Sequence, residues 1–177
     1  MSLITGERLF PVPTTIAAQF RQTVVMWVIK DEEIPTVDEF WSTYENIEPC
    51  LQEEGIRGIP NFEVHIVDPN KEPSEADLDP YFHTPILINC DPGDNEDDRF
   101  DRIVLNILLL ALGPDPYNFV IISKNKDFVL NKDFGQGTNF SSVCDSLREM
   151  GVQIAVAHPD HFKDFDRRIS QTEVAPF

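Results

Sequence analysis

The chain has 177 residues, of which 41% are hydrophobic, and this is enough apolar content for one α/β domain with a buried core. Thirty-one acidic residues against fourteen basic ones give a formal net charge of −17, which argues against tight, independent binding of RNA or DNA. The sequence has neither an apolar stretch of about 18 residues, as a membrane-spanning helix needs, nor the apolar run of a secretory signal at its N-terminus.

The first third of the chain predicts strand, helix and strand. Residues 23–29, TVVMWVI, form a continuous apolar and β-branched run, which is typical of a strand covered on both faces. Thr36 with Glu39 three residues later has the pattern of a helix start, and Gly55 ends that helix. Residues 61–67, NFEVHIV, alternate in polarity and predict a strand with one wetter face.

The middle of the chain alternates acidic segments with apolar ones. Residues 68–80 are acidic and contain prolines, so we expect a mobile loop there, and residues 84–90, TPILINC, predict another buried strand. A second acidic loop, 91–98, leads into a helix at about 98–112. The residues expected on its buried side share helical spacing; they are Ile103, Val104, Ile107, Leu108, Ala111 and Leu112.

The last third repeats the alternation of strand and helix. Residues 118–123 predict a strand, 131–139 a loop rich in Gly and Asn, and 152–158 a last strand. Between them lies a short helix that ends at Gly151. Because strands alternate with helices throughout, we predict a three-layer α/β/α fold with a mainly parallel central sheet, in one domain covering residues 1–177.

Acidic residues follow the predicted strands. In a parallel sheet the ends of the strands meet at one edge, where ligands bind. Three acidic groups are expected there: Asp31 with Glu32 and Glu33, the segment from Asp94 to Asp101, and Asp127. Grouped carboxylates suit Mg²⁺ or Mn²⁺, which can activate water and stabilise a phosphodiester transition state. The alternative interpretation is that these acidic loop residues are solvated and have no specific function.

Four segments carry a family resemblance. They are MWVIKDEEIP (26–35), DDRFDRIVLNILLLAL (97–112), VIISKNKDF (120–128) and LREMGVQIAVAHP (147–159). In these segments, over about residues 23–159, the chain resembles the NYN domain, a PIN-like ribonuclease fold of meiosis-arrest RNA regulators and many plant proteins. The first segment keeps Trp27, Ile29 and Pro35 of the family pattern F-W-D-I-E-N-x-x-x-P.

The chain departs from the family pattern at positions where that pattern has acidic residues. Positions that carry acidic residues in the family are occupied here by Val28, Lys30, Asn106 and Asn125. The resemblance leaves Asp127 as a retained acid, with Asp98 or Asp101 at the helix start and Asp31 beside the first strand as further candidates. Asn can offer an oxygen but not the negative charge that holds a divalent ion. We therefore interpret this edge as a vestigial site, in which Lys30 replaces the metal and neutralises Asp127 or Asp101.

Three functional hypotheses remain open. The first is a catalytically inactive NYN domain without a metal cofactor, serving as a protein-interaction module in RNA regulation or silencing. The second is a weakly active Mg²⁺- or Mn²⁺-dependent ribonuclease that uses Asp98, Asp101 and Asp127 as its metal ligands. The third is a nucleotide- or phosphate-binding α/β module, for which GQGTN (135–139) is only a weak signal because the chain has no P-loop.

The expected partners are other proteins, for instance members of an RNA-regulatory complex, with weak or indirect RNA binding. A dimer or heteromer through a helix face is an open alternative. Three widely spaced cysteines without a C-x-x-C pair predict reduced thiols in an intracellular protein, cytoplasmic or nuclear.

Several remaining side chains are expected to be structural. Trp27 and Trp41 fit core positions, and Phe162 and Phe165 are expected to pack rather than to dock a partner. His158 and His161 are three residues apart, but the sequence shows no third metal ligand for them.

Overall fold

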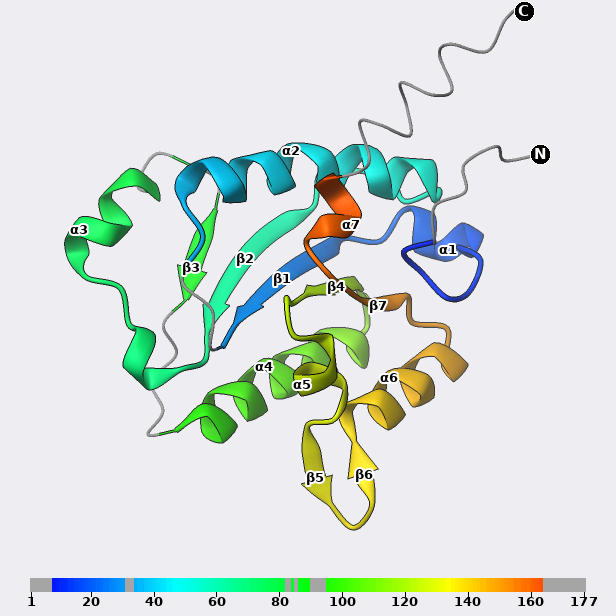
Figure 1. Ribbon diagram of the computed structural model, residues 1–177. Coiled ribbons are helices and arrows are strands. Elements are labelled where there is room, and N and C mark those ends of the chain that lie inside the picture. Colours follow the sequence, from blue (N-terminus) through cyan, green and yellow to red (C-terminus); the bar gives the residue numbers. More distant parts are fainter. Residues whose placement is uncertain (1–7, 31–33, 82–83, 85, 90–94, 164–177) are drawn as a thin grey trace, which may run out of the picture.

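The protein is built around a five-stranded, all-parallel sheet (Figure 1). The computed structural model describes residues 8–30, 34–81, 84, 86–89 and 95–163. In the spatial order β3-β2-β1-β4-β7, the strands are Leu87–Asn89, Asn61–Ile66, Thr23–Ile29, Asn118–Ile122 and Ile154–Ala157. β1 is central and pairs with β2 through Ile29 and Ile66, and with β4 through Trp27 and Ile122.

Helices cover both faces of the sheet, which confirms the predicted three-layer α/β/α fold (Figure 1). On one face lie α2 (Val37–Glu53) and α7 (Asp160–Lys163). On the other lie α4 (Glu96–Ala111), α5 (Lys126–Leu130) and α6 (Phe140–Glu149). A short α1 (Ile16–Gln19) precedes β1. Within the described residues, no helix is both long and apolar enough to span a membrane.

The alternating side chains of β1 create two separate cores. Val25, Trp27 and Ile29 point into the layer below α2 and α7, where they join residues such as Phe40 and Phe162. The even-numbered residues of the strand face α4, α5 and α6; they are Val24, Met26 and Val28. Because both faces are covered, all seven residues of the strand are buried, and this explains its continuous apolar sequence.

Side-chain caps set the starts of several helices. Thr36 caps α2, as predicted, since its hydroxyl accepts a hydrogen bond from the backbone N–H of Glu39 at 3.3 Å. Asn95 and Asn139 cap α4 and α6 in the same way, each with its side-chain oxygen at 2.9 Å from a backbone nitrogen. Local sequence therefore fixes where each of these helices begins.

Two segments expected to be loops have regular structure. The predicted mobile loop at 68–80 contains the 3₁₀ turn Pro69–Lys71, the helix α3 (Glu75–Leu78) and the 3₁₀ turn Asp79–Tyr81. Ser74 and Asp77 form a capping box that starts α3, a local signal that an acidic, proline-bearing composition conceals.

The second such segment, 131–139, folds into an antiparallel hairpin of β5 (Asp133–Gly135) and β6 (Thr138–Asn139). Its turn has positive φ at Gly135, Gln136 and Gly137, which explains the glycines there. The sequence interpretation of this segment as a plain loop was wrong because the strands are too short to show an alternating pattern.

Three burial predictions were wrong at the margins of the core. The strand predicted at 84–90 is shorter than expected, and Leu87 is 56% exposed because β3 lies at the edge of the sheet. Trp41 is exposed on α2 and stacks on Tyr44 with ring centroids 5.4 Å apart. Leu112 follows the last turn of α4 and is exposed.

Phe162 is fully buried, which confirms that it packs in the core, whereas Phe165 lies outside the described residues.

Candidate functional site: the acidic edge of the sheet

The strand order reverses between β1 and β4, and this is where a doubly wound sheet offers a binding site. Along the chain, β1, β2 and β3 follow one another outward from the centre, and β4 returns to the other side of β1. Lys30 follows β1 at this point, and Ser123, Lys124 and Asn125 follow β4. We call the ends of β1 and β4, with the starts of α4 and α5, the acidic edge.

Lys30 lies in the middle of the acidic edge. Its ammonium is 3.9 Å from a carboxylate oxygen of Glu96 at the start of α4, and 3.9 Å from the ring centroid of Phe128 on α5. The sequence predicts Asp127 or Asp101 as the partner of this lysine, whereas the structure places Glu96 beside it. A cation–π contact of this kind holds the ammonium between the two helices.

Lys132 is a second cation at the acidic edge, and sequence reasoning missed it. Its Nζ lies 2.9 Å from Asp97 and 3.2 Å from Asp101, and its side chain is only 8% exposed. Burial of the ammonium works to lower the pKa of Lys132, but the hydrogen bonds to Asp97 and Asp101 outweigh it, so the pKa is raised. Lys132 is therefore a firmly charged counter-ion for two carboxylates.

Arg99 is the third cation of this region. It is buried on α4, where it donates to the backbone carbonyl of Ile66 at the end of β2 at 3.3 Å and pairs with Glu72. A buried guanidinium needs such partners, because an uncompensated charge is costly away from water. The sequence signal available for Arg99 is its place on the apolar side of the predicted helix, one position before Phe100.

The remaining predicted site residues have separate surroundings. Val28 is fully buried in the core, and Asn106 is exposed on α4, so neither faces the acidic edge as the alignment with the family implies. Asp98 and Asp127 are exposed in the first turns of α4 and α5. Asp31, with its neighbours Glu32 and Glu33, and Asp94 lie outside the described residues.

Asn125 has a structural role at the acidic edge. Its side-chain oxygen accepts a hydrogen bond from the backbone N–H of Phe128 at 3.0 Å, which caps α5. Its own backbone N–H donates to the hydroxyl of the buried Ser123 at 3.0 Å. This amide, at a position where the NYN pattern has an aspartate, therefore organises the turn from β4 into α5.

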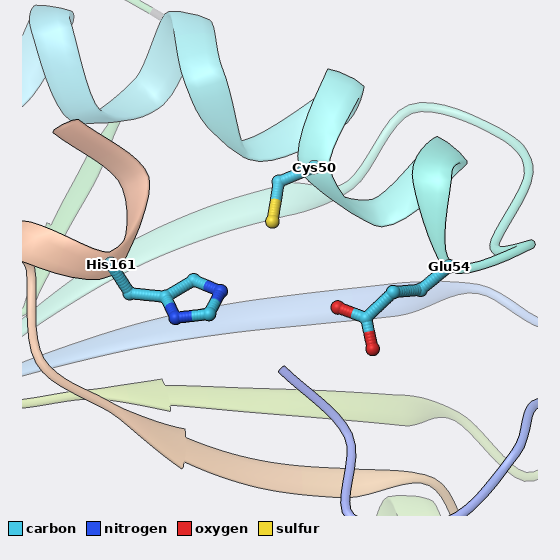
Figure 2. Close-up of side chains that lie close together, drawn as sticks. All are labelled: Cys50, Glu54 and His161. Atoms are coloured by element: carbon cyan, nitrogen blue, oxygen red, sulfur yellow. The ribbon is translucent and has the colours of Figure 1, made fainter. Parts of the chain in front are cut away.

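The described carboxylates of the acidic edge form no set of three candidate metal ligands. Within the described part of the chain, one such set lies elsewhere: Cys50 and Glu54 on and after α2, and His161 on α7 (Figure 2). The ligand atoms of this set all lie within 4.8 Å of one another. Sequence reasoning missed it, although Cys50 and Glu54 are one helical turn apart, because nothing local links them to His161.

Comparison of the chain with protein-family models, with curated proteins and with solved structures found no match in any of the three. The NYN resemblance therefore stays a prediction, and the function is argued from the geometry of the chain itself.

Proposed function

We propose that this chain is a catalytically inactive, PIN-like domain of the NYN type, which serves as a protein-interaction module in RNA regulation or silencing. Two features support the proposal. Lysine ammonium groups contact the carboxylates of the acidic edge, and leucines on one side of α4 are exposed.

The described residues of the acidic edge do not fit the Mg²⁺ or Mn²⁺ ion that the resemblance implies. Such an ion needs several negatively charged oxygens with free lone pairs. Asp101 and Asp97 are instead bonded to the ammonium of Lys132, and Glu96 lies beside Lys30. A divalent cation would have to displace both lysines against their attraction to these carboxylates, so we derive no metal-dependent step from this site.

The exposed face of α4 is the observation that carries the interaction role. Leu105, Leu109 and Leu112 are 56%, 66% and 57% exposed. Their spacing of four and three residues places them on one side of the helix, away from the buried side that packs on the sheet. We call these three residues the leucine face. Contiguous exposed leucines cost free energy in water and commonly mark a contact with another protein.

The charge of the chain indicates what kind of partner suits the leucine face. At −17, the molecule repels acidic proteins and nucleic acids beyond the immediate contact. A partner with an apolar strip and basic residues around it would gain both burial of the leucines and favourable long-range attraction. The net charge therefore argues against direct, charge-driven RNA binding as the main role of the domain.

A two-part experiment tests the proposal. Purified domain is first incubated with single-stranded RNA and Mg²⁺ or Mn²⁺, and we expect no cleavage. Proteins captured by the domain from cell extract are then purified, and their affinities are compared for wild type, the double variant Leu105→Glu/Leu109→Glu and Leu87→Glu. Leu87 is the matched control because it is as exposed as Leu105 but lies on β3.

We expect the double variant to lose at least about tenfold in affinity, since two leucines that the partner would cover are replaced by charges, while Leu87→Glu binds like wild type. Sedimentation of the same three proteins detects self-association through the leucine face. Equal affinities for all three would contradict the interaction role. Metal-dependent cleavage that Asp127→Asn abolishes would replace the proposal with the ribonuclease alternative.

A further inference from the structure

Cys50, Glu54 and His161 come together on the side of the sheet opposite the acidic edge helices (Figure 2). Cys50 is a buried thiol in the last turn of α2, and Glu54 follows one helical turn later, so both side chains lie on the same side of the helix. Figure 2 shows His161 approaching them from α7, with its ring between the helix and the strands of the sheet. A thiol, a carboxylate and an imidazole thus converge from two elements.

The position of His161 is fixed by the fold. α7 packs against α2, and the neighbouring Phe162 is fully buried in the same core as Cys50. The Nε2 atom of His161 is itself buried. This imidazole is therefore held at the cluster by packing, and it is not a surface side chain that passes near it by chance.

Glu54 is also held in place, by the segment that precedes α1. Its two carboxylate oxygens accept hydrogen bonds from the backbone N–H groups of Leu9 at 2.9 Å and Phe10 at 3.0 Å. The guanidinium of Arg8 lies 3.7 Å from the same carboxylate. Each oxygen still has a second lone pair, so these bonds orient the carboxylate without using all of its capacity. Hydrogen bonds of this kind to a ligating carboxylate are typical of the surroundings of metal sites.

We propose that Cys50, Glu54 and His161 form a zinc-binding site. Sulfur, nitrogen and oxygen ligands together suit Zn²⁺, whereas Mg²⁺ and Ca²⁺ prefer oxygen alone. One thiolate and one carboxylate with a neutral imidazole carry two negative charges, which balance the ion. This inference does not depend on the proposed function, because none of the three residues belongs to the acidic edge or to the leucine face.

The spacing of the ligand atoms is compatible with an ion after a small contraction. Bonds of about 2.0–2.3 Å in tetrahedral geometry place zinc ligands roughly 3.3–3.8 Å apart. The three ligand atoms lie within 4.8 Å of one another, so side-chain rotations that bring them about 1 Å closer are sufficient.

Of the three proposed ligands, His161 lines a cavity of about 530 Å³, together with Leu9 and Phe10, and we assign the fourth ligand position to that side of the site. Three protein ligands with one position left for water distinguish an open zinc site from a closed structural one. The cavity is lined by charges of both signs, among them Arg8, Lys126 and Asp160, so water is the expected fourth ligand.

Cobalt(II) titration of the purified chain tests the site, because Co²⁺ replaces Zn²⁺ in such sites and reports its ligands by its absorption. We expect one equivalent of Co²⁺ to give the intense visible bands of a tetrahedral ion and a near-ultraviolet band from thiolate-to-cobalt charge transfer, both removed by Zn²⁺. Cys50→Ser should abolish the charge-transfer band. His161→Asn should weaken binding by at least about tenfold.

Cys144→Ser is the matched control. Cys144 is also a buried thiol, and burial raises its pKa to about 11, but it lies in the core on the other face of the sheet. The control should give the wild-type spectrum, and circular dichroism checks that each variant is folded. A charge-transfer band that survives Cys50→Ser, or purely octahedral cobalt in wild type, would overturn the site. X-ray absorption of the zinc-loaded wild type, which needs no variant, must show one sulfur neighbour.

Discussion

At the scale of single residues, lysines decide the chemistry of the acidic edge. Lys132 makes hydrogen bonds to both Asp97 and Asp101, and Lys30 contacts Glu96 and the ring of Phe128. A lysine can replace a metal ion as counter-charge, but it cannot lower the pKa of a bound water as a divalent metal ion does. These lysine contacts are the reason for proposing that the edge does not carry out metal-dependent hydrolysis.

Lys132→Met tests how much this counter-ion stabilises the fold. We expect a loss of about 1 kcal/mol in unfolding free energy at pH 7, because the lysine is buried while both carboxylates are largely exposed to water. Urea unfolding of the variant measures it. Lys124→Met is the control, since it removes the same charge from an exposed position. Equal stabilities of the two variants would contradict a special role for Lys132.

The contribution of Lys132 to the stability of the fold has a defined pH dependence. The pKa of Lys132 is raised in the folded chain, so its contribution is fully present below the unfolded value of about 10.4. The contribution is lost as the pH rises through the higher folded pKa. We therefore expect the stability difference between wild type and Lys132→Met to stay constant from neutral pH to about pH 9 and to shrink above about pH 10.4.

At the scale of elements, the turn from β4 into α5 gives Asn125 a structural role. The side chain of Asn125 caps α5, and that helix carries both Phe128, which contacts Lys30, and Asp127. A short helix of five residues depends strongly on its cap, because it has few internal hydrogen bonds.

Asn125→Ala should destabilise the chain by about 1 kcal/mol through loss of the cap, whereas Asn125→Asp should stay within about 0.5 kcal/mol of wild type because Asp caps equally well. Thermal or urea unfolding of both variants measures this. Asn125→Asp also restores the acid of the NYN pattern, and we expect no metal-dependent RNA cleavage from it while Lys30 and Lys132 remain. Cleavage by that single variant would show that the absence of one acid, and not the presence of the lysines, prevents RNA cleavage by the wild type.

At the scale of the whole molecule, the net charge of −17 opposes compaction. We expect the melting temperature to rise by roughly 2–4 °C, or about 1 kcal/mol, when NaCl is increased from about 0.01 M to 0.15 M. Over this range the Debye length falls from about 30 Å to about 8 Å, so general repulsion is screened more than the close lysine pairs. Scanning calorimetry at several NaCl concentrations measures the effect, and KCl is the control for specific ion binding. A melting temperature that falls with salt would show that the ion pairs dominate over the general repulsion.

The order of strands and helices could be read from the chain because it depends on local signals. The buried run of β1, the cap at Thr36 and the apolar side of α4 each lie within one continuous segment, and periodicity and capping report on such segments directly. Predictions failed where burial depends on neighbours. Leu87 is exposed because its strand lies at the edge, and Trp41 because it lies on the outer side of α2.

The sequence by itself determined the fold class, the excess of acidic residues, and the presence of Val28 and Asn125 where the NYN pattern has acids. Only the tertiary structure decided which groups meet: Lys132 with Asp97 and Asp101, and Cys50 and Glu54 with His161. The physical reason is that these contacts join residues far apart in the chain. Their distances follow from the packing of whole elements on the sheet, whereas strand and helix formation follows from neighbours only a few residues away.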